Sequence, residues 1–438
     1  MQFEAGLIGI GFVVVWMALP LLWYSMLEAA GIHFGRPTIP SIVIGFIVLL
    51  QYIGIPFLFF KLDSHRVDVV QDSAVMLRVW GATSAAITLL SFGFLLGREC
   101  VGPLSTFRGT CMRPLKRHQQ VGVCVMGVVC VLVLLRYLTI VGFSNIAILA
   151  AIGLNEGVDQ SVARSLMGND FSGSYHWYQL FMRDILMIVV LVQYVQYKSS
   201  RRPSALIPLA VFGSALIFSL LMAVEKGPIA NFIIAVMLVK VWLERDGRLW
   251  GGQLMAYSIA MMAILSATYM IFMGASDIRD AVGSVFSRIF TGQVEASYHY
   301  LRFFPNEEGW LLGRSLPNPG GILPFEPYPL TRSVKEFVSP ELTKLGIVGS
   351  MPTVFWGELY ANAGYLAVII VTPVIGFALY LFNRILFQFR LDPTSLVLFV
   401  WSMLHYAQLS GTGLGTFIAD SNLVAVLIVL IAIRTRIV

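Results

Sequence analysis

The sequence predicts an all-α, polytopic integral membrane protein with about eleven membrane-spanning helices and one large, partly helical loop. Hydrophobic residues make up 57% of the 438 residues and charged residues only 12%, whereas a soluble domain carries about 25% charged residues. The mean hydropathy is +0.79. Apolar runs of about 20 residues, the length that crosses a bilayer as a helix, recur along the chain. Residues 274–351 form the only long run without this pattern.

These apolar runs set the expected order of elements. Residues 1–273 would hold the first eight spans and a small outer loop at 143–176, residues 274–351 the large outer loop, and residues 352–438 the last three spans. The first span is not expected to be a signal peptide, because no basic segment precedes it. We expect the spans near 6–26, 41–60, 79–97, 120–142, 177–197, 205–224, 229–243, 251–273, 353–382, 394–410 and 421–433.

Lysine and arginine residues in the short connections indicate the orientation, because such residues concentrate on the cytoplasmic side. The segment Arg98–Gln120 carries five basic residues and one acid, so we expect it in the cytoplasm. Alternation puts four more basic stretches on that side, at 198–204, 244–248, 383–392 and the C-terminal tail. The N-terminus, the loops 143–176 and 274–351, the turn Glu225–Pro228 and residues 411–420 then lie outside.

The composition also argues against several classes of partner. The formal net charge of +6 comes mostly from loop lysines and arginines, so it indicates orientation and not binding to nucleic acid. The four cysteines show no metal-site spacing with histidine and no disulfide framework. The outer loops carry no acidic motif of the kind that holds a metal ion. We therefore expect no metal, no other cofactor and no nucleic-acid partner.

A polar stripe in the large outer loop is the first candidate for a functional site. Read as a helix, Arg288, Gly292, Glu295 and His299 follow one another at spacings of four, three and four, which places them on one face. Gly292 would leave a gap beside the charged groups. The alternative is a polar stripe that only faces water. Both interpretations stay open on the sequence alone.

Outer cations form the second group of candidates. Lys226 stands at the start of the seventh span, where it would add charge to a helix N-terminus that favours phosphate, or would extend only to the membrane surface. Arg164, Arg279 and Arg314 lie in outer loops, against the cytoplasmic bias of arginine, and this points to an anionic ligand. His176 ends the small outer loop, where a role in the site and an interfacial position are both open.

The start of the ninth span supplies a third group. Glu358, Asn362 and Tyr365 lie at spacings of four and three, so a continuous helix would place them on one face. A carboxylate at the edge of a bilayer is costly unless it faces a polar cavity. The proline- and glycine-rich segment 317–329 before it is expected to be an ordered loop or lid.

Four short segments together resemble the Wzy-type polymerases of O-antigen and related bacterial polysaccharides, in the subgroup of oligosaccharide repeat unit polymerases. The resemblance covers roughly 140–380 and rests on EKGPIANF, RIFTGQ, GRSLPNPGGILPFEP and MPTVFWGELYANAGYL. It implies a GT-C-like glycosyltransferase of the bacterial inner membrane that needs no metal and works on the periplasmic side. Such an enzyme transfers the growing glycan from undecaprenyl pyrophosphate to the non-reducing end of a new lipid-linked repeat unit.

The resemblance also implies roles for residues and partners. The outer arginines of the family match Arg288 and, by weaker similarity, Arg164, Arg279 and Arg314, and its GELY-type motif falls on Glu358. The implied partners are the undecaprenyl-pyrophosphate-linked oligosaccharide, membrane lipids and a chain-length regulator protein.

These roles suggest a mechanism. Arg288 would grip the donor pyrophosphate through its planar guanidinium, with charge added by Lys226 and Arg279. Glu295 or His299, with Glu358 as a third candidate, would act as the base for the acceptor hydroxyl. The other expected substrate-binding residues are Arg164, Arg314, His176 and Asn362.

Two other functions remain open on the sequence. An O-antigen ligase would share the architecture and the donor, and only the motif matches favour the polymerase. A transporter or flippase for lipid-linked sugars would need charged or broken helices near the middle of the membrane. The charged positions here gather at one face instead, which favours chemistry at the surface.

Overall fold

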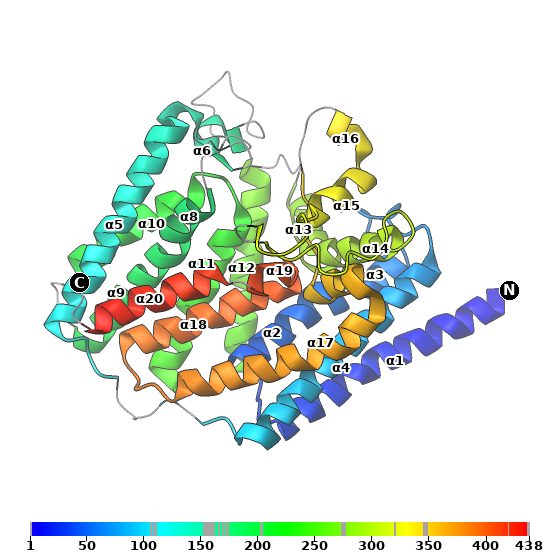
Figure 1. The fold of residues 1–438 in the computed structure, drawn as a ribbon, viewed down its shortest axis with the longest axis horizontal. Helices are drawn as coiled ribbons and strands as arrows, with labels where there is room; N and C mark the ends of the chain where they lie inside the picture. Colours follow the sequence, from blue (N-terminus) through cyan, green and yellow to red (C-terminus); the bar gives the residue numbers. More distant parts are fainter. Residues whose placement is uncertain are drawn as a thin grey trace. The chain divides into compact units, whose positions relative to one another are not determined.

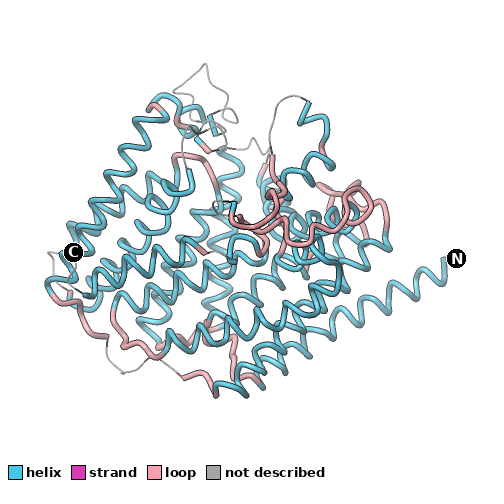
Figure 2. Tube along the Cα trace, in the orientation of Figure 1, coloured by secondary structure: helices cyan, strands magenta, loops and turns pink. Residues whose placement is uncertain are grey.

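The computed structural model describes residues 2–105, 107, 112–151, 163–164, 167–168, 171, 175–201, 205–272, 277–318, 321–344, 349–418 and 420–435. Every regular element within these ranges is a helix, as Figures 1 and 2 show. The chain forms two compact units. The first comprises residues 1–106, 278–387 and 405–419, and the second comprises residues 107–277, 388–404 and 420–438.

The first unit contains the N-terminal helices and most of the predicted large loop, which is partly helical as expected. Its elements are α1 (Gln2–Ala29), α2 (Ile39–Ile47), η1 (Val48–Tyr52), α3 (Ile55–Phe59), α4 (Ser73–Val101), α13 (Ile278–Phe286), η5 (Ser287–Thr291), α14 (Gly292–Phe303), α15 (Leu330–Val338), α16 (Pro340–Lys344), α17 (Phe355–Phe387), η7 (Gln408–Ser410) and α19 (Gly415–Ile418). Of the short elements, η1 and η5 are π-helical turns and η7 is a 3-10 turn.

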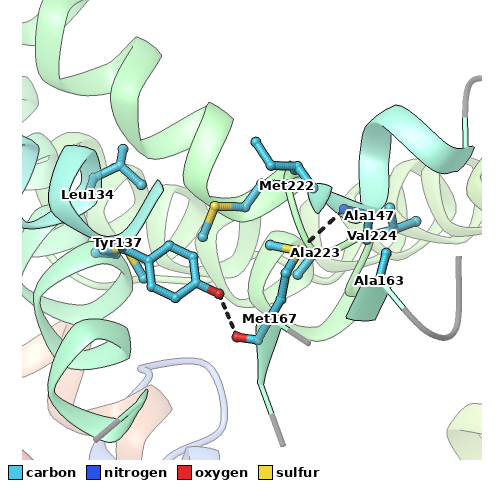
Figure 3. Packing of buried hydrophobic residues seen from close by; sticks show 10 residues of the cluster. Leu134, Tyr137, Ala147, Ala163, Met167, Met222, Ala223 and Val224 are labelled. Atoms are coloured by element: carbon cyan, nitrogen blue, oxygen red, sulfur yellow. Dashed lines mark hydrogen bonds between the residues drawn. The ribbon is translucent and has the colours of Figure 1, made fainter. Parts of the chain in front are cut away.

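The second unit contains α5 (Arg117–Val141), η2 (Phe143–Asn145), α6 (Ala147–Ala151), α8 (Tyr175–Gln179), η3 (Leu180–Ile185), α9 (Leu186–Ser200), α10 (Leu206–Leu221), α11 (Lys226–Arg245), α12 (Gly251–Phe272), most of α18 (Pro393–Ala407) and α20 (Ser421–Thr435). Figure 3 shows its buried cluster at the end of α5. Tyr137 donates to the Met167 carbonyl (2.5 Å), and the Ala147 N–H lies 3.3 Å from Met167 Sδ. The described part of the loop 143–176 is therefore packed onto the helices.

Within the described residues, nine helices are long and apolar enough to cross a membrane. They are Gly9–Ala29, Ile39–Phe59, Ser73–Val101, Arg117–Val141, Tyr175–Ser200, Lys226–Arg245, Gly251–Ile271, Phe355–Phe387 and Gly415–Arg434. The two other predicted spans fall on α10 and α18, which have only 16 and 15 residues. The all-helical, multi-pass class is confirmed, and the count of eleven stays a prediction.

Glycines bring α4 and α17 into close contact in the first unit. A side chain at Gly93 would collide with the carbonyl of Pro373 and with Gly376, and one at Gly376 would collide with the carbonyl of Leu90. Small residues that let backbones approach are typical of helix pairs in membranes, where packing and not hydrophobicity drives association. This pair forms the frame that carries the site described next.

Candidate functional site

A buried carboxylate, Asp63, joins the loop between α3 and α4 to the π-helical turn η5. Its Oδ2 accepts hydrogen bonds from the hydroxyls of Ser287 (2.7 Å) and Thr291, and its Oδ1 accepts from the His65 N–H (3.0 Å). Burial raises the pKa of this carboxyl, but these hydrogen bonds and the charge of Arg66 outweigh burial and leave the pKa lowered. Asp63 is therefore charged at neutral pH and holds the loop in place.

Arg66, from the same loop, makes the central ion pair. Its Nε donates to Glu295 Oε2 at 2.6 Å, and a second guanidinium nitrogen donates to the Ser287 hydroxyl. The side chains of Arg66 and Glu295 are only 16% and 19% exposed. The guanidinium lies beside Gly292, where an added side chain would start 3.4 Å from it. The gap expected at Gly292 is thus filled by an arginine from another part of the chain.

His299 lies one turn after Glu295 on α14, with its Nε2 4.0 Å from Glu295 Oε1. Burial, together with the nearby charges of Arg302 and Lys335, lowers the pKa of His299 to about 4 against the opposing effect of Glu295. Its Nδ1 is buried and has no hydrogen-bond partner among the described residues. The imidazole is therefore neutral at pH 7, and its Nδ1 keeps an unused hydrogen-bonding capacity inside the protein.

These groups line a polar cavity of about 450 Å³. Its wall is formed by the α3–α4 loop, α14 and the end of α15: Ser64, His65, Arg66, Val67, Asp68, Val69, Gln71, Glu295, His299, Arg302, Phe337 and Val338. The far end of the loop is fixed as well, because the Tyr298 hydroxyl accepts from the N–H groups of Gln71 (3.2 Å) and Asp72 (3.0 Å). The cavity therefore combines two guanidinium groups with carboxylates and a neutral imidazole on a fixed frame.

The predicted stripe holds for Glu295 and His299 but changes at Arg288. The turn Ser287–Thr291 is π-helical, and its wider turn shifts the register of the residues before α14. Ser287 and Thr291 are consequently buried, whereas Arg288 is exposed. The Cδ of Arg288 still lies 3.6 Å from the position of a side chain at Gly292, so Arg288 and Arg66 approach the same glycine.

Glu358 and Asn362 form a separate polar knot. Glu358 Oε2 accepts from the N–H groups of Leu414 (2.5 Å) and Gly415 (2.8 Å), and its Oε1 accepts from the Ser315 hydroxyl (2.7 Å). The Asn362 amide nitrogen donates in turn to that hydroxyl (2.7 Å). Both carboxylate oxygens are engaged, so the geometry favours a role in joining two loops to α17 over a role as a base.

The expected alignment of Tyr365 with these two residues is wrong. The helix is interrupted at Ala363 and Gly364, so the spacing of three from Asn362 does not keep Tyr365 on the same face. Tyr365 is accordingly exposed, whereas Glu358 and Asn362 are buried.

The remaining predicted residues lie elsewhere in the two units. In the first unit, Arg279 is exposed on α13, and Arg314 pairs with Glu308 at 3.5 Å. Lys226, Arg164 and His176 belong to the second unit. There, Lys226 Nζ lies 3.0 Å from the ring centroid of Tyr269, His176 Nε2 lies 3.1 Å from Ser421 Oγ, and Arg164 is exposed.

The sequence interpretation missed the residues of the α3–α4 loop, above all Asp63 and Arg66. The density of charged residues in this segment was a signal that could have identified it. Five of the twelve residues from Lys61 to Asp72 are charged, in a chain with 12% charged residues overall. The alternation of spans that predicts an outer position for 274–351 predicts the same position for this loop.

No family model, curated protein or solved structure matches this chain. In the described part of the chain, no group of three or more histidine, cysteine, aspartate or glutamate residues is arranged to hold a metal ion. The described residues form a multi-pass helical membrane protein with a polar, arginine-containing cavity in its first unit.

Proposed function

We propose that this protein is a glycosyltransferase of the bacterial inner membrane that polymerises undecaprenyl-pyrophosphate-linked oligosaccharide repeat units for O-antigen or a related surface polysaccharide. The observation that carries the proposal is the cavity of Arg66, Glu295, His299 and Arg302 in a chain of membrane-spanning helices. The cavity would face the periplasm, and a chain-length regulator protein would be a partner. The resemblance of the four sequence segments to the Wzy-type family supports the same function.

The arginines suit a pyrophosphate leaving group. Guanidinium groups bind phosphate oxygens through two parallel hydrogen bonds, and they stabilise the negative charge that develops as the bond to the sugar breaks. Arg66 and Arg302 line the cavity. The side chain of Arg288 passes beside Gly292, as the guanidinium of Arg66 does. These three residues would hold the donor, with Arg288 approaching from the exposed side.

Glu295 is the base in this proposal. A donor pyrophosphate competes with Glu295 for Arg66, so donor binding would release the carboxylate from its 2.6 Å ion pair. The acceptor hydroxyl then attacks the anomeric carbon of the donor sugar and gives its proton to Glu295. The new C–O bond forms, the bond from that carbon to the pyrophosphate oxygen breaks, and its electron pair leaves with undecaprenyl pyrophosphate. Neutral His299 would accept a hydrogen bond from the acceptor sugar.

The lipopolysaccharide ladder of a deletion strain tests the proposal. Loss of a polymerase leaves core plus one repeat, loss of a ligase leaves bare core, and loss of a solute transporter leaves the ladder intact. We expect core plus one repeat, with full rescue by the wild-type gene. Glu295→Gln and Arg66→Lys should each reduce extension by about a hundredfold or more, and Arg332→Lys, outside the cavity, should restore the ladder. Bare core in the deletion strain would refute the polymerase.

A further inference from the structure

The helix α17 is interrupted where a loop meets it. Ala363 and Gly364 have non-helical backbone angles, and Gly364 has a φ of +65°, which favours glycine. The interruption frees the carbonyls of Ala361 and Asn362, which accept hydrogen bonds from the N–H groups of Leu311 and Leu312, both at 3.0 Å. The loop backbone thus replaces the missing helical hydrogen bonds.

The interruption divides α17 into a short first part and a longer second part whose length is close to the thickness of a bilayer. The part after it, Tyr365–Phe387, has 23 residues, which is about 34 Å at 1.5 Å per residue. A hydrocarbon core is about 30 Å thick, so this part is long enough to cross it alone. Its exposed residues include Leu366, Ile369, Ile370 and Val374, an apolar face suited to lipid. Gly364 therefore lies at the end of a segment that is by itself long enough to span the hydrocarbon core.

The loop at this end of the segment presents apolar side chains to the outside. Leu312 is 78% exposed, although hydrogen bonding to α17 fixes its backbone. The Trp310 indole covers Gly364 and packs edge-on against Tyr360 at 5.2 Å, while part of the ring stays exposed. Tryptophan and tyrosine favour the boundary between headgroups and acyl chains. The Leu312 N–H donates to the Asn362 carbonyl, so Leu312 lies beside the same end of this part of α17.

A second turn of the same loop is ordered around Asn318. Its amide nitrogen donates to the carbonyls of Leu323 (3.0 Å) and Phe325 (2.8 Å), and its amide oxygen accepts from the Leu323 N–H (2.8 Å). This turn leaves Ile322 82% exposed. The turn therefore holds a large aliphatic side chain outward in a defined position.

We propose that Trp310, Leu312 and Ile322 dock into the headgroup–acyl boundary of the bilayer and that the partner of this surface is lipid. The inference does not depend on the reaction performed in the cavity. Ser315, between the two docking points, hydrogen bonds to Glu358, so lipid contact would also steady the polar knot that joins this loop to α17.

Depth measurement by spin labelling tests the proposal. In a chain whose four cysteines are replaced by serine, single cysteines at Leu312 and Ile322 are spin-labelled in vesicles of phosphatidylethanolamine and phosphatidylglycerol. Ile370→Cys, on the exposed apolar face of α17, is the lipid control, and Glu307→Cys, exposed earlier in the same loop, is the water control. We expect the labels at 312 and 322 to collide with oxygen more than with a water-soluble nickel chelate, as at 370.

Two results would overturn the docking surface. Nickel accessibility equal to that at Glu307 would place the loop in water. Protection from both reagents would mean that protein, such as a second copy of the chain, covers the loop. Each labelled variant is first compared with the parent by gel filtration and thermal midpoint, so that a misfolded variant is replaced by the neighbouring Leu323→Cys.

Discussion

The Arg66–Glu295 pair gives the sharpest test of the site. Removal of one partner of a buried ion pair costs about 3–5 kcal/mol, because the other charge is left buried and unpaired. These side chains are 16% and 19% exposed, so water lowers the expected cost to about 2–4 kcal/mol. Arg66→Ala should therefore lower the thermal midpoint of the purified protein by several degrees.

The double variant separates a true pair from two independent losses. Glu295→Ala alone should also destabilise, but Arg66→Ala combined with Glu295→Ala should cost less than the sum of the singles by about 1–3 kcal/mol, since no unpaired partner remains. Thermal unfolding in detergent, followed by near-ultraviolet circular dichroism, measures all three variants. Additive costs would refute the pairing.

A matched control is present in the same unit. Arg332 pairs with Glu336 at 2.7 Å, nearly the same distance, but these side chains are 55% and 40% exposed. Exposed pairs contribute about 0–1 kcal/mol because water and salt screen them. Arg332→Ala should therefore change the thermal midpoint by about a degree or less. A shift as large as that of Arg66→Ala would show that burial is not the cause.

Three further predictions concern the same region. The pKa of His299 in the folded protein, about 4, lies below the ordinary value of about 6.5. As the pH falls from 6.5 to 4, the unfolded chain therefore binds a proton before the folded protein does, and stability is lost. His299→Gln should flatten this part of a plot of thermal midpoint against pH, and an unchanged slope would contradict the lowered pKa of His299. Gly292→Val should displace Arg66 and abolish chain extension, whereas Gly227→Val, where no atom lies within 4 Å of an added side chain, should retain it in the ladder assay. Glu358→Ala leaves two backbone N–H groups without their acceptor and should destabilise by about 2–4 kcal/mol in thermal unfolding; a variant of wild-type stability that lacks only activity would favour a catalytic role instead.

The elements of the fold were predictable because the length of an apolar run and the period of a helix are local properties of the sequence. Each predicted span coincides with a helix, although α10 and α18 are short. Two local departures were not predictable from spacing. The π-helical turn Ser287–Thr291 shifts the helical register through a different backbone hydrogen-bond pattern, which the spacing of side chains does not reveal. The helix α17 is interrupted at Gly364, but many membrane helices contain a glycine without any interruption.

The site was predictable only where its residues are neighbours in sequence. Glu295 and His299 are four residues apart, so a helix brings them together. Arg66 and Glu295 are 229 residues apart, and only the packing of the first unit joins them. The charge density of the α3–α4 loop indicated an unusual segment, but nothing in the sequence names its partner.

That separation has a consequence for how the protein is made. Asp63 and Arg66 are synthesised early, while Thr291, which binds Asp63, follows 228 residues later. Through most of translation the early loop carries charges whose final hydrogen bonds do not yet exist, and a chain halted before α13 would present its α3–α4 loop without these contacts. Completion of the cavity is therefore a late event in biogenesis, and a truncated product that has inserted its first helices would still lack it.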